Sequence, residues 1–508
     1  MSDAKTPRPW AISSLAIIGA LALLKLVLHL VYNRWYGYHH DELYFLACGH
    51  HLAFGYVDHP PLTPFLARLA DELFGQSLTG LRFFPALAGS AAVFLTGLLT
   101  RRLGGSPFAQ ALACVSMIIA PVYLRAGNVL AIPSFEPFYW VLCSYLVVRI
   151  IQEDKPRLWL VVGVVAGLGL MNKHTMLFWG LGLAAGLLLT PQRKLLKSPW
   201  PYAGGAVAFL LFLPNLIWQI QNGWPTLEFI RRLNEETMSG ISALQFLLGQ
   251  VLYLHPINAP IWIAGLVFFF TGSGKPYRVL GWLFITVLLL LVIAKSKIYY
   301  LAPAYPPLLA GGAIAIEHLA ARRHWAWLRP AAFAVLTVMG ALFVPVALPI
   351  LTIGATDRYI SALTFGKLDN VYELTGDLHG QFGWRERVEA IAQVYNRLTT
   401  EEKPSAIIFT AGYGIAGAVD YFGGAHGLPK AYSGTMTYYL WGPPPPGTRT
   451  VIAAGIHKEA LAQSFATVEN GVTVELENVN PGDSPFHVVV CREPRLPLDK
   501  AWPQVREW

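Results

Sequence analysis

The chain has 508 residues, of which 54% are hydrophobic and 13% are charged. Soluble globular proteins carry about 25% charged residues, so this composition argues against an ordinary soluble enzyme and indicates a membrane protein. A net charge of +8 is compatible with a nucleic acid partner, but the basic residues stand in small groups between apolar runs. That distribution is typical of membrane topology, so no nucleic acid partner is expected.

Apolar runs predict the spanning helices. A helix needs about 20 mostly apolar residues to cross a bilayer, and about eleven runs come near that length. They are residues 10–32, 81–100, 107–125, 133–151, 157–172, 174–190, 200–220, 258–272, 278–294, 301–320 and 327–353. The shorter apolar stretch 241–254 is either a further span or a helix on the membrane surface. The first run has a basic start but no cleavage site after it, which predicts a retained helix.

The basic residues between these runs predict the orientation. If the N-terminus is cytoplasmic, every inside segment is basic, as the positive-inside rule requires. The inside groups are Lys5 with Arg8, Arg101-Arg102, Arg149 to Arg157, Arg193 to Lys197, Lys275 with Arg278, and Arg322 to Arg329. Residues 33–80 and everything after about residue 354 are then extracytoplasmic.

The cysteines indicate no disulfide framework. None of the four forms a CxxC pair, and Cys114 and Cys143 lie inside apolar runs. They are therefore predicted to be packing residues.

Residues 33–80 form a long outer loop that is dense in ionisable side chains, including His40-Asp41-Glu42 and Asp58-His59. Its pattern predicts an amphipathic helix over 41–53, a turn, and a second helix over 62–75. Pro60-Pro61 suits the start of the second helix, where no amide donor is needed. A plain connector would not need two acidic clusters beside an apolar membrane.

Three interpretations of Asp41 and Glu42 stay open at this point. They are acids at a helix start, where negative charge is favoured, or metal ligands with neighbouring histidines, or they supply a general base. A carboxylate at the edge of a low-dielectric membrane has a raised pKa, which suits a base.

Three lysines fall on the side that the positive-inside rule depletes. Lys173, Lys295 and Lys297 stand at the outer ends of spans. Either their long side chains reach up to the interface, or they bind an anion there, since lysine is a good phosphate ligand.

Three segments in order resemble one family. They are HHDELYFLACGHHLAFGYVDHPPL in the outer loop, GLGLMNKHTML at 167–177 and KSKIYYLAPAYPPLLAGGA at 295–313. With the span pattern, they resemble the GT-C glycosyltransferases, in the group of protein O-mannosyltransferases, aminoarabinose transferases and bacterial RgtA/B/C/D-like proteins. The expected fold is a polytopic α-helical membrane domain of GT-C type over 1–354, with about 11 to 13 spans, followed by a small α/β extracytoplasmic domain over 355–508.

The resemblance implies a membrane glycosyltransferase of the bacterial inner membrane. Its donor would be a sugar on a polyprenyl phosphate, and its acceptor a hydroxyl of a lipid, glycan or protein at the outer face. Asp41 matches the family's catalytic acid and would be the general base, with Glu42 supporting it or contacting the acceptor. Attack opposite the leaving phosphate would invert the anomeric configuration.

The same resemblance suggests further site residues. Asp58 matches an acid that helps to hold a metal in some members, and His255 is the candidate second ligand, against a simple interfacial histidine. A divalent metal is thus the one cofactor suggested. His59 stands where the family has a lysine that contacts the lipid phosphate. The other candidate phosphate contacts are Lys173, Lys295, Lys297, Tyr299 and Tyr300.

The pattern of residues 355–508 predicts a separate small domain. Strands are predicted at 406–411, 450–456 and 486–491, and helices at 384–398 and 456–465. The segment Gly412-Tyr413-Gly414-Ile-Ala-Gly417 matches a dinucleotide fingerprint. That function is rejected because no acid-ended second strand follows at the required distance, and the predicted compartment is poor in nucleotides.

A second segment of this domain, 429–446, is similar to one in bacterial members of the group. Those proteins commonly carry asparagine and histidine there, whereas this chain has Thr435-Met436-Thr437. The domain is expected either to shape the acceptor site or to act as a stabilising cap.

Two other functions compete with a glycosyltransferase. A transporter or flippase for a lipid-linked substrate would place ionisable residues in mid-span and show internal repeats, and neither feature is clear in the sequence. A glycan ligase or polymerase would use a similar site at the outer face. The sequence alone therefore does not clearly distinguish this function from that of a transferase.

Overall fold

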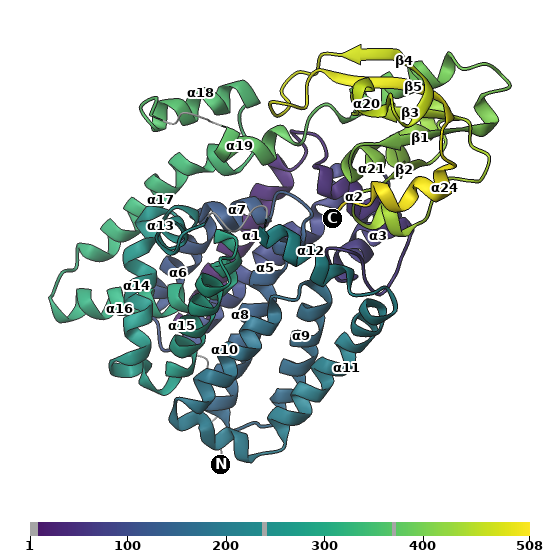
Figure 1. Ribbon diagram of the computed structural model, residues 1–508. Helices are drawn as coiled ribbons and strands as arrows, with labels where there is room; N and C mark the ends of the chain where they lie inside the picture. Colours follow the sequence, from purple (N-terminus) through teal and green to yellow (C-terminus); the bar gives the residue numbers. More distant parts are fainter. Residues whose placement is uncertain (1–8, 236–240, 368–371) are drawn as a thin grey trace. The chain divides into compact units, whose positions relative to one another are not determined.

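The computed structural model describes residues 9–235, 241–367 and 372–508, so the predicted inside charges Lys5 and Arg8 lie outside the described residues. The chain divides into two compact units (Figure 1). The span unit comprises the residues up to Asn33, then Arg82–Gly223 and Arg231–Ile350. The mixed unit comprises Arg34–Leu81, Trp224–Ile230 and Leu351–Trp508. The outer loop, expected to belong with the spans, therefore forms one unit with the C-terminal residues.

The span unit is helical. Its helices are α1 (Pro9–Tyr32), α5 (Phe83–Arg102), α6 (Pro107–Ile119), α7 (Pro121–Ala126), α8 (Glu136–Glu153), α9 (Leu158–Asn172), α10 (Met176–Leu188), α11 (Trp200–Gln221), α13 (Ala243–Tyr253), α14 (Ala259–Phe270), α15 (Arg278–Ile293), α16 (Pro306–Arg322) and α17 (Leu328–Ala347). Glycines let some of them approach closely, as small residues do in membrane helices. A Cβ added at Gly265 of α14 would lie 1.8 Å from the Leu308 carbonyl oxygen of α16.

Within the described residues, six helical stretches are long and apolar enough to cross a membrane, and the pair α13 and α14, bent by 95°, makes a seventh candidate. The chain is thus a multi-pass membrane protein. Several other predicted spans are shorter helices, such as α6, α9 and α10. Proline accounts for part of the shortening: the predicted run 107–125 breaks at Pro121, where α6 has ended and α7 begins. Proline lacks the amide that would continue a helix.

The mixed unit contains one five-stranded sheet of order β2-β1-β3-β5-β4 (Figure 1). The strands are β1 (Ala406–Thr410), β2 (Ala431–Ser433), β3 (Thr450–Ala454), β4 (Phe465–Val474) and β5 (Phe486–Pro494). β1 is parallel to β2 and β3, whereas β5 is antiparallel to both β3 and β4. The three predicted strands are confirmed. The predicted helix 456–465 shrinks to α23 (Lys458–Leu461), and β4 was not foreseen.

Helices of the mixed unit come from both of its main segments. From the outer loop come α2 (His40–His50) and α3 (Leu62–Phe74), close to the two predicted helices. From the C-terminal segment come α18 (Ile353–Leu363), α19 (Tyr372–His379), α20 (Trp384–Asn396) and α21 (Tyr413–Phe422). Shorter helices are α22 (Met436–Leu440), α24 (Leu498–Ala501) and the first part of α12 (Pro225–Leu233). α2 packs against α21, so the outer loop and the C-terminal segment share a core.

Candidate active site

The first turn of α2 separates the roles of its two acids. The Glu42 carboxylate accepts a hydrogen bond from the His39 backbone N–H at 2.8 Å, and His39 Nδ1 accepts one from the Asp41 backbone N–H at 3.3 Å. This reciprocal pair is a capping box, which satisfies amides at a helix start. Glu42 is fully buried. The expectation that it contacts the acceptor is therefore not supported, and the helix-start interpretation explains it.

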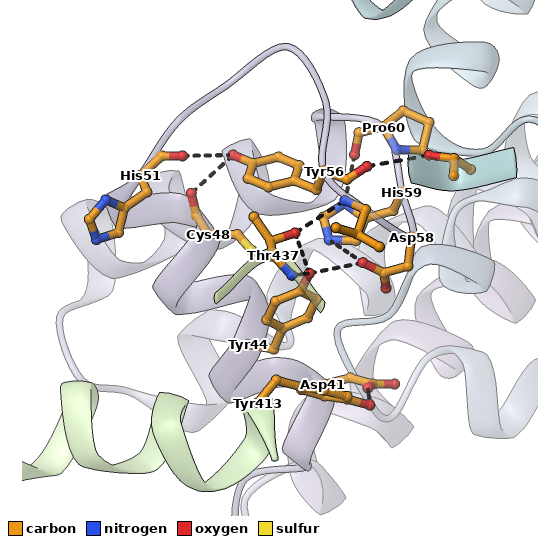
Figure 2. Close-up of polar contacts among 12 residues, drawn as sticks. Asp41, Tyr44, Cys48, His51, Tyr56, Asp58, His59, Pro60, Tyr413 and Thr437 are labelled. Atoms are coloured by element: carbon orange, nitrogen blue, oxygen red, sulfur yellow. Dashed lines mark hydrogen bonds and ion pairs between the residues drawn. The ribbon is translucent and has the colours of Figure 1, made fainter. Parts of the chain in front are cut away.

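Asp41 points elsewhere and stays accessible. Its side chain is 34% exposed. The Tyr413 hydroxyl donates to Asp41 Oδ1 at 3.0 Å (Figure 2). His40 Nε2 lies 3.4 Å from the same oxygen. His39 Nδ1 lies 3.8 Å from Oδ2. The side chain thus combines ordered partners with access for a substrate.

The pKa of Asp41 lies below its ordinary value. Burial raises this pKa, but the His40 and His39 imidazoles and the Tyr413 hydroxyl outweigh that effect. The sequence-based expectation of a raised pKa is therefore wrong for Asp41. An ionised carboxylate near neutral pH is nevertheless the form that a general base requires.

A second carboxylate, Asp58, is held in a buried network of the same unit (Figure 2). The Tyr44 hydroxyl donates to Asp58 Oδ1 at 2.9 Å and lies 2.6 Å from Thr437 Oγ1, which accepts from the Val57 N–H. Burial raises the pKa of Asp58. Thr437, in the segment that departs from other family members, thus makes polar contacts with the outer loop.

His59 is not accessible to a phosphate. It is fully buried, its Nδ1 is 2.9 Å from the Pro60 carbonyl oxygen, and its Nε2 lies 3.7 Å from Asp58 Oδ1. Its ring packs among aromatic rings, including those of Tyr56 and Phe45. The structure therefore does not support His59 as a phosphate contact.

The surroundings of His255 occupy both of its ring nitrogens. His255 Nδ1 accepts from the Ile257 N–H, so its Nε2 carries the proton and lies 3.2 Å from the Met339 carbonyl oxygen. Neither nitrogen of His255 has a lone pair left for a metal, and His255 is not retained as a ligand. Asp58 with the adjacent His59 supplies too few ligands to define a site.

Among the residues that the structure describes, one other group of side chains comes close enough to share a cation. Ligand atoms of His39, His40 and Asp41 lie within 4.8 Å of one another. His39 Nδ1 already accepts a hydrogen bond as the cap of the helix. We therefore interpret the two histidines as groups that act electrostatically on the Asp41 carboxylate and not as metal ligands.

The span unit brings together three of the predicted phosphate contacts. Lys173, which follows α9, lies with its Nζ 4.0 Å from the ring centre of Tyr300 and 5.6 Å from that of Tyr299. Lys297 is half-buried and Lys295 is exposed, both in the segment after α15.

Lys173 also has an ionic partner that sequence reasoning missed. Glu136, at the start of α8, accepts from Lys173 Nζ at 2.7 Å and also from the Thr175 hydroxyl. Both members of this ion pair are largely buried, with 13% and 4% of their side chains exposed. An acid at the start of a predicted span, in FEPFYW, was the available signal.

Sequence reasoning also missed Tyr413 as a site residue, because it lies inside the glycine-rich segment whose pattern matches a nucleotide site.

The capping role of Glu42 gives a stability prediction. Glu42→Ala should lower the free energy of unfolding by at least about 1 kcal/mol, the usual effect of losing a cap. Glu42→Gln should be nearly neutral, because glutamine also completes a capping box. Thermal unfolding of the purified protein in nanodiscs measures both, and equal midpoints for wild type and Glu42→Ala would contradict the assignment.

Comparison with known proteins agrees with this architecture. The structure is similar to the crystal structure of ArnT from Cupriavidus metallidurans bound to undecaprenyl phosphate, with a TM-score of 0.60 over 95% of this chain and 98% of that one, at 14% sequence identity. Residues 58–218 match the family of dolichyl-phosphate-mannose-protein mannosyltransferases. The fold is therefore similar to that of a solved ArnT structure, and about a third of the sequence is similar to this mannosyltransferase family.

Particular relatives are sugar transferases. The chain is 30% identical over 178 residues to an undecaprenyl phosphate-alpha-4-amino-4-deoxy-L-arabinose arabinosyl transferase of Pseudomonas fluorescens, covering 33% of this chain and 32% of that protein. It is 25% identical over 274 residues to the lipid A galacturonosyltransferase RgtD of Rhizobium johnstonii, covering 52% and 58%. The chain therefore spans less than two thirds of the length of either relative.

Proposed function

We propose that this protein transfers a sugar from a polyprenyl phosphate to a hydroxyl of a lipid, glycan or protein at the outer face of the bacterial inner membrane. The N-terminus would be cytoplasmic, and the mixed unit, with Asp41, extracytoplasmic. The observation that carries the proposal is the Asp41 carboxylate, which is one-third exposed and held by Tyr413 and His40. The relatives named above act on polyprenyl-linked or lipid substrates, which supports this substrate class.

In the proposed reaction, Asp41 takes the proton from the acceptor hydroxyl. The hydroxyl oxygen forms a bond to the anomeric carbon on the side opposite the phosphate. The bond between that carbon and the phosphate oxygen breaks, and its electron pair stays on the polyprenyl phosphate. One displacement inverts the anomeric configuration and requires one base. Because phosphate is a good leaving group, cations that stabilise its charge replace a general acid.

Lys173 is the residue proposed to stabilise that phosphate. Its ammonium group is positioned by Glu136 and by the faces of Tyr300 and Tyr299. A preorganised charge in a largely buried setting acts more strongly on a developing anion than a solvated one. Lys297 and Lys295 remain proposed secondary contacts.

Mass spectrometry of the cell envelope tests the proposal for any sugar that the donor carries. A deletion strain should lose one sugar residue from a lipid, glycan or protein, and a polyprenyl phosphate carrying that sugar should accumulate. Complementation with the wild-type gene should reverse both changes. In a reconstituted reaction, NMR of donor and product should show opposite anomeric configurations.

Other outcomes would favour the competing functions. Accumulation of a complete glycan on a polyprenyl pyrophosphate would indicate a ligase or polymerase. If the lipid-linked sugar accumulated only in the inner leaflet, the protein would be a flippase. Neither result is expected for an outer-face transferase.

A further inference from the structure

The glycine-rich segment 412–417 has a packing role in the mixed unit. α21 begins at Tyr413, and its glycines face α2. A Cβ added at Gly414 would lie 2.8 Å from the Cβ of His40, and one at Gly417 would lie 2.8 Å from the backbone carbonyl carbon of Leu43. A real Cβ would not fit at either distance, so the glycines permit α21 to approach the backbone of α2.

This close approach places the Tyr413 hydroxyl within hydrogen-bond distance of Asp41. Tyr413 is the first residue of α21, and its hydroxyl donates to Asp41 Oδ1 at 3.0 Å. The ring of Tyr413 packs against that of Tyr44, with centres 4.8 Å apart, and lies 6.0 Å from that of His40. Figure 2 shows Tyr413 beside Asp41, with Tyr44 between them and the Asp58 network.

We propose that Tyr413 is a positioning residue for the catalytic base Asp41, and that the glycine-rich segment 412–417 serves to place it there. This inference rests on the proposed function. It gives the C-terminal segment a specific role in catalysis, beyond shaping the acceptor site or stabilising the unit. The outer loop alone would supply the carboxylate but not the hydroxyl that orients it.

The hydroxyl has two physical effects. It holds the carboxylate in one orientation by donating to Oδ1. Oδ2 is then the oxygen that accepts the proton from the acceptor hydroxyl. It also favours the ionised form, because a donor stabilises a carboxylate more than a carboxylic acid. Removing the hydroxyl should therefore misalign the base and make it bind a proton at higher pH.

Other charged and titratable groups act on Asp41 from the surrounding elements. His40, on α2, and His39, which caps this helix, lower the pKa of Asp41, whereas Asp377 on α19 raises it. Glu42 is buried in the same turn of α2, and Asp58 on the following loop is electrostatically coupled to Asp41. Tyr413→Phe leaves all of these groups in place, so a change in the titration of Asp41 would report on the hydroxyl alone.

The test follows Asp41 itself and does not depend on turnover. A water-soluble carbodiimide modifies protonated carboxyl groups, and peptide mass spectrometry measures the extent of modification at Asp41 against pH. The full-length protein in nanodiscs is compared as wild type, Tyr413→Phe and Tyr421→Phe. Tyr421 is the matched control, because it lies on the same helix and its hydroxyl contacts Tyr38 instead of Asp41.

The labelling midpoint of Asp41 should move to higher pH in Tyr413→Phe and stay at the wild-type value in Tyr421→Phe. Gly417→Ala, which should push α21 away from α2, is expected to move the midpoint in the same direction. An unchanged midpoint in folded Tyr413→Phe would overturn the inference, as would an equal shift in the control. The labelling result stands whether or not transfer is detected, so it separates this inference from the proposed function.

Activity supplies a second measurement. At the pH optimum, Tyr413→Phe should lower kcat/KM about threefold to tenfold, which corresponds to the loss of one hydrogen bond. The acid limb of its pH profile should move upward, whereas a purely structural defect would lower activity equally at every pH. Equal losses across the profile would also count against the inference.

Discussion

Asp41→Asn should lower kcat by about 100-fold to 10,000-fold, the range that a general base supplies. Asparagine keeps the size of the side chain and can still accept the Tyr413 hydroxyl, but it cannot take a proton from the acceptor. KM for the donor should change little, because the donor is assigned to other residues. Steady-state kinetics with the sugar identified from the envelope would measure both parameters.

Glu42→Gln is the matched control for this substitution. It also replaces a carboxylate by an amide, one residue further along α2, but it preserves the capping box. The expected result is near wild-type kcat. If Asp41→Asn retained wild-type activity, or if Glu42→Gln lost as much as Asp41→Asn, the assignment of the base to Asp41 would be wrong.

The pH dependence of the wild-type reaction follows from the same group. Asp41 must be ionised to accept a proton, and its pKa is lowered by its neighbours, with burial acting in the opposite direction. Activity is therefore expected to persist to pH values below the ordinary pKa of an aspartate and to be lost as the pH falls through the lowered pKa.

The second large effect concerns Lys173. Lys173→Met should raise KM for the polyprenyl donor about tenfold to 100-fold, because it removes one charge-assisted contact to phosphate. The substitution also leaves Glu136 as a buried carboxylate without this partner, which can cost about 3–5 kcal/mol of stability. The effect of Lys173→Met on donor binding must therefore be distinguished from its effect on stability.

The double variant Lys173→Met/Glu136→Gln provides that separation. It removes the buried negative charge, so it should regain much of the thermal stability while keeping the high donor KM. Lys275→Met, at an exposed lysine on the predicted cytoplasmic side, should leave KM unchanged. Recovery of wild-type KM in the double variant would show that Lys173 acts through stability and not through the donor.

The multi-pass helical character and the helices of the outer loop were predictable because both depend on local patterns. The number of spans was not, because only six or seven candidates among the described residues match the eleven predicted runs in length and apolar character. A run of apolar residues specifies a membrane helix wherever it occurs. Likewise, acids such as Asp41 and Glu42 are favoured in the first turn of a helix without any tertiary contact. The run 107–125 was less predictable, since it breaks at Pro121 into two helices.

The sequence by itself thus determined that the protein spans a membrane and that two acids stand together in the outer loop. Only the tertiary structure decided between them. Adjacent residues of a helix point in directions about 100° apart, so packing buries Glu42 and leaves Asp41 accessible.

The partners of the site residues were also fixed by tertiary packing. Lys173 pairs with Glu136, which lies 37 positions away in the sequence. The hydroxyl that donates to Asp41 belongs to Tyr413, which lies 372 positions further along the chain. Such contacts depend on which helices pack together, and no local pattern encodes them. The glycine-rich segment illustrates the difference: its pattern matched a nucleotide motif, whereas in the folded unit the same glycines allow two helices to meet.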